Sequence, residues 1–473
     1  MKEVRFDIRQ GHQNLAQLWA ARQELSWQAI KLYLQGFWYR STTSYWFLPA
    51  LILLGAVLLS FVTLTIDEWA GSGWVTRWRW IYSHDPAGAR ATLSTVAGSM
   101  ITVAGVVFSI TIVVLTLASN QFGPRLIRNF MLDKGNQVVL GVFTSTYLYC
   151  LLILRRIQAV EDATFVPSLS LTTAILLAVL SIAFLIYFIH HVTIFMQVES
   201  VVNSVSHELH QTLDRLFPDF ADPNEIESQR PILEEPNCSI PIAQSGYIQA
   251  VDYQGLVRAA QRHQGTLELL YRPGRYLVAG TAVARFGPGD KAPDELVAAV
   301  QAALLLGSHP TPEQDPEFAV RQLVEVAVRA LSTGVNDPFT AMTCIDRIAT
   351  GLGMAASRAP RPILHRDKAG AVRLIDTPVT FADLAEAAYG PLRRHGSHQL
   401  AVMLRLLESL AMILPLVHRA ADRQVLFDHG SLAFESAREA ASQSRDRQEL
   451  EERHRALEDL MQGAQPHRAA PGH

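Results

Sequence analysis

Small and hydroxyl-bearing side chains recur along one uncharged stretch of the chain, residues 91–124. They stand at steps of 4, 4, 3, 4 and 7 residues, which is the spacing of one helix face: Ser94, Gly98, Thr102, Gly105, Ser109 and Thr116. The opposite side carries bulky apolar residues: Met100, Val103, Val107, Ile110, Val114 and Leu117. Hydroxyls on such a face can line a water-filled pore, and small residues also let helices pack closely. The spacing therefore leaves two interpretations open, a pore-lining face in a homo-oligomer and ordinary small-residue helix packing.

Basic residues follow this stretch at Arg125, Arg128 and Lys134. At a membrane interface such a cluster can contact anionic lipid or attract permeating anions, and it can also serve only to set the topology. His190 and His191 lie near the end of a later apolar stretch. An imidazole pair there can ligate haem or sense pH, but a polar cap at the interface is the simpler interpretation, so no metal site is predicted.

One turn between two predicted helices carries polar residues that can hold a ligand. In LSTGVNDPFTAMTCID, Gly334 ends one helix and Asn336 or Asp337 caps the next, whose first residue is Pro338. A helix N-terminus flanked by Asn and Asp can bind a ligand, which makes Gly334, Asn336 and Asp337 a possible ligand turn. A tight interhelical turn explains the same residues equally well.

Other kinds of chemistry find no support in the sequence. The three cysteines, Cys150, Cys238 and Cys344, are far apart and form no disulfide framework or zinc cluster. The hairpin RPGRYLVAG has no lysine at its tip, so a covalent carrier role is not supported. No nucleotide-binding, hydrolase or metalloprotease motif occurs in a credible context, and we expect no enzyme activity and no cofactor. A net charge of −3 also argues against a nucleic-acid surface.

Four uncharged stretches must position the polar face. They are Ser41–Ile66, a segment within Ala91–Pro124, Gly135–Leu154 and a segment within Ala163–Val198. Each supplies the roughly 20 residues that a helix needs to cross a bilayer. Nine Lys and Arg residues lie in the N-terminal tail and second loop, against five in the first and third loops. This bias predicts that both termini are cytoplasmic.

The fold class predicted is an α-helical membrane protein of four transmembrane helices with a C-terminal cytoplasmic α+β domain, a small β module followed by a helical bundle. The predicted parts are an amphipathic helix (1–40), the membrane domain (41–198), a helix and linker (199–238), a β-rich module (239–290), a helical domain (291–440) and a charged helical tail with a disordered end (441–473). No internal repeat of useful length is evident.

Two long motifs resemble the DUF2254 family of predicted bacterial membrane proteins. They are RATLSTVAGSMITVAGVVFSIT followed by LASNQFGPRLIRNFMLDKGNQ, and PEQDPEFAVRQLVEVAVRALSTGVNDPFTAMTCID. The resemblance covers roughly residues 40–430 and departs from the family pattern at Ser332-Thr333, where Ser-Pro is expected. It implies an inner-membrane protein with four spans and a cytoplasmic domain, and it implies no activity.

Two functional hypotheses follow. The first is a homo-oligomeric ion channel or pore in the lipid bilayer, lined by the second span and regulated by the cytoplasmic domain. The second is a membrane-anchored sensor or scaffold whose soluble domain binds a ligand or partner. The absence of acidic and basic residues inside the spans favours a channel over a coupled transporter. An enzyme acting on lipid or a small metabolite is a weak third.

Overall fold

The computed structural model describes residues 46–75, 86–122, 133–160, 163–195, 197–217, 233, 235, 237–358 and 363–463. The predicted amphipathic helix over residues 1–40, and Arg125 and Arg128, lie outside this part of the chain. The chain divides into two compact units. The N-terminal unit comprises Met1–Ser119 and Pro124–Ile194, and the C-terminal unit comprises Asn120–Gly123 and Phe195–His473.

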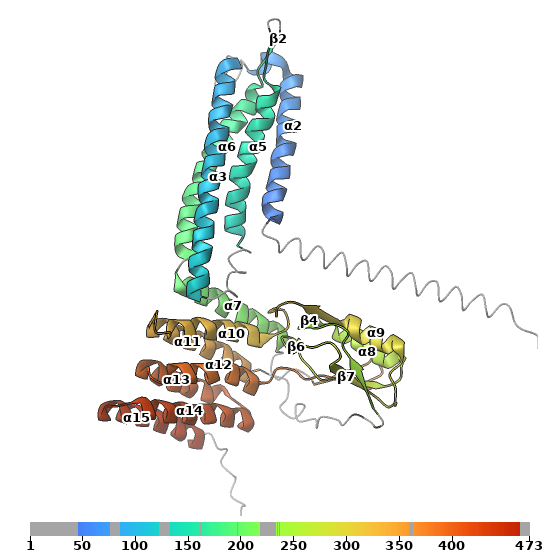
Figure 1. Ribbon diagram of the computed structural model, residues 1–473, viewed down its shortest axis with the longest axis vertical. Helices are drawn as coiled ribbons and strands as arrows, with labels where there is room; N and C mark the ends of the chain where they lie inside the picture. Colours follow the sequence, from blue (N-terminus) through green and yellow to red (C-terminus); the bar gives the residue numbers. More distant parts are fainter. Residues whose placement is uncertain are drawn as a thin grey trace, which may run out of the picture. The chain divides into compact units, whose positions relative to one another are not determined.

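The N-terminal unit is built on α2 (Phe47–Val75), α3 (Pro86–Phe122), α5 (Lys134–Arg156) and α6 (Ser168–Phe195) (Figure 1). A short antiparallel pair, β1 (Gln158–Val160) and β2 (Ala163–Phe165), joins α5 to α6. Among the described residues, four helical segments are long and apolar enough to cross a membrane: Phe47–Trp69, Pro86–Ala118, Lys134–Arg156 and Ser168–Ile194. The four predicted spans are thus confirmed as helices of the required length and composition.

Helix α5 is the central helix of the four, which explains why it is the least apolar. Of its span 56% is buried, against 22–28% for the others. Its Tyr149 is fully buried and its hydroxyl lies 2.9 Å from that of Thr63 on α2, and it donates to the carbonyl of Ser170 on α6 at 3.1 Å. Gly141 lets α2 approach closely, since a Cβ there would lie 2.7 Å from Cδ1 of Ile52. Hydroxyl groups on α5 therefore bond to neighbouring helices within the unit.

Charged residues at one end of the unit tie all four helices together. The Asp67 carboxylate of α2 accepts from the N–H groups of Leu169 and Ser170 at 3.0 and 2.9 Å, and from the Ser170 hydroxyl at 2.8 Å, which caps the start of α6. A guanidinium of α3, Arg90, donates to the carbonyl of Ile157 just after α5 at 2.6 Å. On the surface, Arg156 and Glu68 pair at 3.3 Å.

Replacing Asp67 with alanine should lower the stability of the protein in detergent by about 2 kcal/mol, because two backbone donors and a hydroxyl lose a charged acceptor. Thermal unfolding of the purified protein measures the effect. Glu68→Gln is the matched control: its partner pair is about half exposed on both sides and should cost under about 1 kcal/mol. Equal losses for the two variants would exclude a capping role for Asp67.

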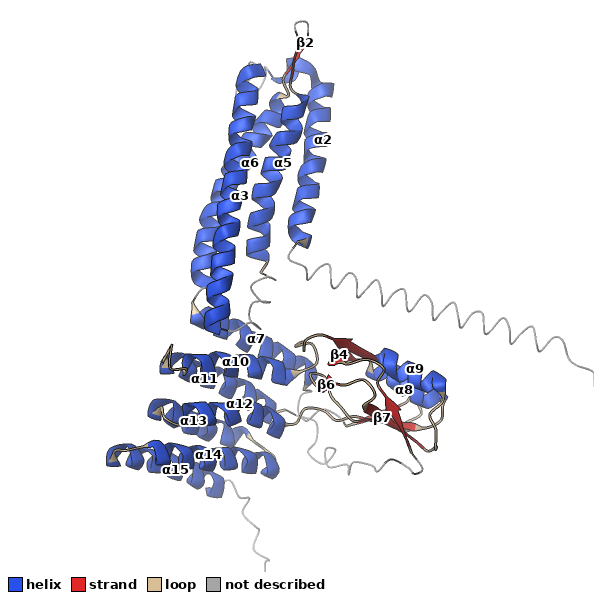
Figure 2. Cartoon of the chain, in the orientation of Figure 1, coloured by secondary structure: helices blue, strands red, loops and turns tan. Residues whose placement is uncertain are grey.

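In the C-terminal unit, α7 (Val198–Leu216) precedes a β module (Figure 2). One sheet has the order β3 (Cys238–Pro241), β7 (Ala282–Gly287), β5 (Thr266–Leu269), β10 (Val372–Ile375), β9 (Leu364–Arg366). The other has the order β6 (Tyr276–Leu277), β4 (Gly246–Val251), β8 (Leu304–Gly307). Strands β10 and β5 are parallel. Helices α8 (Tyr253–Arg262) and α9 (Asp294–Ala303) contribute to the same apolar core as the strands.

The β module extends beyond the residues expected for it. It takes in α9, β8 and the β9–β10 hairpin, all from segments that the sequence assigned to the helical domain. The reason is physical: Leu374 of β10 completes the core formed by α8, α9 and the earlier strands, a long-range contact that local periodicity does not reveal.

The remaining helices form three stacked hairpins (Figure 1). These are α10 (Pro316–Ala330) with α11 (Pro338–Ala356), α12 (Phe381–Gly396) with α13 (Leu400–Ile413), and α14 (Ala420–Ala440) with α15 (Ser444–Gly463). Helices α10, α12 and α14 pack in one row and α11, α13 and α15 in a second, while α7 covers the first hairpin. Arg405 of α13 bonds to Asp346 of α11 at 2.6 Å and so joins two layers. The predicted helical bundle is thus a layered stack, in the manner of α-solenoids.

Candidate functional site

The polar face predicted for the second span lies on α3, and the structure places it away from the neighbouring helices of its own chain. All six residues are exposed in the single chain: Ser94, Gly98, Thr102, Gly105, Ser109 and Thr116. On the opposite side Met100, Val107 and Val114 are buried at 7%, 2% and 4% exposure, Val103 is half-buried, and Ile110 and Leu117 are exposed. These six residues are called the α3 face below.

The two glycines of the α3 face have open space beside them. A Cβ built on Gly98 or Gly105 meets no atom within 4 Å. Small-residue packing between the described helices of one chain therefore does not account for them. The hydroxyls of Thr102 and Thr116 donate to the carbonyls of Gly98 and Ile112 at 2.8 and 2.9 Å, so their hydrogens are bonded within the helix and their oxygens can still accept a hydrogen bond.

At the other end of the N-terminal unit, Lys134 is the exposed first residue of α5. The preceding Asp133 caps this helix through the N–H of Asn136 at 3.2 Å and contacts Nε2 of His191 at 2.6 Å. The His191 ring stacks on Tyr187, with centroids 5.3 Å apart. His190 points to the exposed side of α6. Within the described residues no group of three or more metal-ligating side chains is found, and His191 is held by a carboxylate on a neighbouring helix, a partner that the sequence did not reveal.

The predicted ligand turn has its polar side chains engaged internally. Asn336 takes a left-handed conformation (φ +48°) and its Oδ1 accepts from Nε2 of Gln399 at 3.0 Å. Asp337 caps α11 by accepting from the N–H and hydroxyl of Thr340 at 3.1 and 2.6 Å. These hydrogen bonds from Thr340 hold the pKa of Asp337 below its usual value. Gly334 is exposed, with open space around its Cα.

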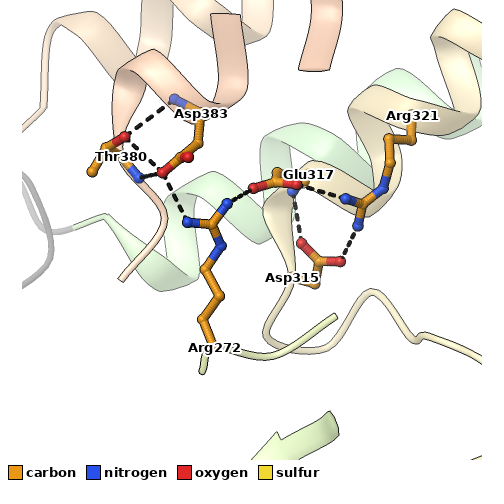
Figure 3. Close-up of polar contacts among 6 residues, drawn as sticks. All are labelled: Arg272, Asp315, Glu317, Arg321, Thr380 and Asp383. Atoms are coloured by element: carbon orange, nitrogen blue, oxygen red, sulfur yellow. Dashed lines mark hydrogen bonds and ion pairs between the residues drawn. The ribbon is translucent and has the colours of Figure 1, made fainter. Parts of the chain in front are cut away.

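A buried cluster of charges in the C-terminal unit was not predicted (Figure 3). Arg272, which follows β5, bonds to Glu317 at the start of α10 and to Asp383 in the first turn of α12, the latter at 2.9 Å. Arg321, one turn along α10, bonds to Glu317 at 2.6 Å and to Asp315. We call these five residues the ion-pair cluster. Arg272, Asp315 and Glu317 are 9%, 2% and 5% exposed.

Backbone geometry directs Arg272 into the cluster. Gly274 in the Arg272-Pro273-Gly274-Arg275 turn has φ +87°, and a Cβ there would overlap the Asp315 carboxylate. Asp383 is oriented by a capping box with Thr380, whose hydroxyl and N–H donate to its carboxylate at 2.7 and 2.9 Å. The cluster thus fixes the β module against the starts of two stacked helices.

The carboxylates of the cluster differ in their affinity for protons. Burial raises the pKa of Asp315 to about 6, although Arg321 opposes this shift. At Asp383 burial also acts to raise the pKa, but hydrogen bonds from Thr380 and Arg272 outweigh it and the pKa is lowered. Burial acts to lower the pKa of Arg272, but Glu317 and Asp383 raise it further, so this guanidinium stays charged.

The raised pKa of Asp315 predicts how the stability of the protein changes with pH. The folded state binds this proton more tightly than the unfolded chain, whose aspartate titrates near 3.8. The resulting stabilisation is complete below about pH 4 and is lost as pH rises through about 6. We expect the free energy of unfolding of wild type, minus that of Asp315→Asn, to fall by about 1–3 kcal/mol between pH 4 and pH 7. Denaturant unfolding of both proteins at several pH values tests this, and a constant difference contradicts it.

Sequence reasoning missed the ion-pair cluster because its members are 111 positions apart at the extremes, Arg272 and Asp383. One signal was available. The motif PEQDPEFAVRQ contains Asp315, Glu317 and Arg321, three charges at the start of a helix whose remaining residues are mostly buried. Charges on a buried helix require partners.

Comparison with known proteins agrees with the presence of membrane-spanning helices. A family model described as a predicted membrane protein (DUF2254) matches residues 42–412. An uncharacterized protein of Mycobacterium bovis and one of Mycobacterium tuberculosis are each 32% identical over 344 residues, which is 70% of this chain. The chain spans 65% of the length of these relatives. No solved structure matches. Both long motifs noted in the sequence fall within the matched range, and the chain belongs to the DUF2254 family of predicted membrane proteins.

Proposed function

We propose that the protein is a homo-oligomeric ion channel or pore of the bacterial inner membrane, lined by the α3 face and regulated by its C-terminal unit. The observation that carries the proposal is the orientation of the α3 face. It carries four hydroxyl side chains and two glycines, and it lies opposite the side that packs in the chain's own core.

An outward face of this composition is poorly suited to lipid alone. Glycine offers acyl chains little contact area, and threonine oxygens have lone pairs that lipid cannot satisfy. If several copies assemble with their α3 faces around one axis, the same oxygens contact water and permeant ions. The glycines then leave the lumen open.

The positions of the charged residues in the N-terminal unit favour a channel over a coupled transporter. In the described part of the N-terminal unit, the acidic and basic residues lie at or near helix ends, and Asp67 and Arg90 there bond to neighbouring helices. Coupled transporters usually place an ionisable group within the membrane for the driving ion. The proposal includes no enzymatic activity.

The chain offers a route for regulation. Helix α6 ends at Phe195 and α7 begins at Val198, and α7 packs against α10 and α11. A rearrangement of the hairpin stack that moves α7 would therefore also displace the end of α6, because only two residues separate the two helices. In this proposal both termini are cytoplasmic, and Lys134 lies at the cytoplasmic mouth, where it meets anionic lipid or permeating anions.

Two measurements on the purified full-length protein test the proposal. Light scattering with subtraction of the detergent mass should give an oligomer. Liposomes that contain the protein should release a trapped potassium or chloride gradient faster than empty liposomes. A monomer that passes neither ion would overturn the proposal and favour the membrane-anchored sensor or scaffold.

A further inference from the structure

The α10–α11 turn exposes two apolar side chains. Phe339 is 75% exposed, more than any other large apolar side chain in the described part of the C-terminal unit, and Val335 is 56% exposed. The polar side chains beside them, Asn336 and Asp337, are occupied by Gln399 and Thr340. The exposed part of this turn is therefore apolar. We call Val335 and Phe339 the apolar tip.

Packing within the C-terminal unit places this tip at one end of α7. Gly351 of α11 lies against Leu209 and Leu213 of α7. Farther along both helices, Arg358 donates to the carbonyls of Leu213 and Phe217, each at 3.2 Å. The two helices therefore run parallel. Phe339 precedes Gly351 by twelve residues. Twelve residues before Leu209 and Leu213 lies the first turn of α7, so Phe339 is level with that turn.

The covalent chain keeps the first turn of α7 close to the membrane. The apolar span of α6 ends at Ile194 and α7 begins at Val198. Four residue steps of 3.8 Å separate their Cα atoms by about 15 Å at most. This limit on the distance between the end of the apolar span and the first turn of α7 holds whatever angle α7 makes with α6.

We infer that Val335 and Phe339 insert into the headgroup and acyl-chain boundary of the bilayer that α6 crosses. Phenylalanine is among the residues that amphipathic elements bury at this depth. The partner is lipid because α7, whose first turn lies level with the apolar tip, begins four residues after the apolar span of the membrane-spanning helix α6. The inference is independent of channel activity, since an anchored sensor would dock its first hairpin in the same way.

Site-directed fluorescence in liposomes tests the inference on the full-length protein. Single cysteines at Phe339→Cys, Val335→Cys and Leu460→Cys carry a nitrobenzoxadiazole probe in a Cys238→Ser background. The other native cysteines, Cys150 and Cys344, are fully buried. Leu460 is the control because it is an exposed apolar residue (38%) on α15, in the third layer of the stack. Lipids that carry a nitroxide on the acyl chain act as one quencher, and aqueous iodide acts as the other.

We expect lipid-borne quenching at positions 339 and 335 to exceed that at 460 by at least about twofold, with a blue-shifted emission and weaker iodide quenching. Lipid quenching equal to that at 460 overturns the inference. Protection from iodide without lipid quenching also overturns it, because protein then covers the tip. Val335→Cys gives an independent reading if the Phe339 variant does not fold, and neither outcome depends on ion flux.

Discussion

Arg272→Met should destabilise the C-terminal unit by about 3–5 kcal/mol, the usual cost of removing one partner from a buried ion pair. Methionine retains much of the side-chain volume but leaves Glu317 buried beside one guanidinium instead of two. Asp383 loses its 2.9 Å contact as well. Denaturant unfolding of the intact protein measures the loss.

Two further variants test whether the loss comes from the ion-pair cluster. Arg275→Met changes an exposed arginine in the same turn and should cost under about 0.5 kcal/mol. The double variant Arg272→Met/Glu317→Gln should recover part of the loss, because the uncompensated buried charge is gone. If Arg272→Met costs no more than Arg275→Met, the ion-pair cluster does not hold the β module to the hairpin stack.

The second large effect is expected on conduction. Gly105→Leu should reduce ion flux from liposomes by at least about tenfold, because it adds a ring of bulky apolar side chains to the lumen. The stability of the single chain should not fall, since nothing lies within 4 Å of the added Cβ and leucine favours a helix over glycine. Flux and thermal unfolding are measured on the same preparation.

Ala104→Leu is the neighbouring control. Ala104 is 4% exposed on the opposite side of α3, so a larger side chain there should cost about 1–3 kcal/mol of stability by overpacking. Gly105→Leu gives a different result for each of three arrangements. If the α3 face lines a pore, the variant loses flux and keeps its oligomeric state. If the face is a dry contact between copies, the oligomer dissociates, and if lipid covers the face, neither property changes. The last two results contradict the pore.

The sequence predicts the membrane helices well because each depends on local composition. The four spans follow from apolar length, and the start of α11 follows from Asp337 and Pro338, a cap and a first-turn proline. The spacing on α3 also groups the six residues of the α3 face on one side of the helix. It does not say whether that side points into the chain's own core or out of it, because both arrangements produce the same period.

Contacts between distant residues are what local patterns leave out. Asp67 caps a helix that begins 101 residues later, with Ser168, and no feature of its own surroundings indicates that partner. The β9–β10 hairpin joins a sheet whose other strands end by Gly287. The hairpin stack likewise has no sequence repeat, because each layer meets different neighbours: α7 covers the first, and α15 buries only Leu450 and Leu457.

Thiol labelling along α3 in intact membranes tests the central claim most directly. Single cysteines at Thr102, Gly105 and Ser109 on the α3 face are compared with cysteines at the buried Met100, Val107 and Val114. Burial raises the pKa of the native Cys344 thiol to about 12, and Cys150 is fully buried, so a Cys238→Ser background is silent. A pore-lining α3 face predicts reaction with a charged, water-soluble reagent at the first three positions and protection at the other three. Protection at all six positions would contradict it.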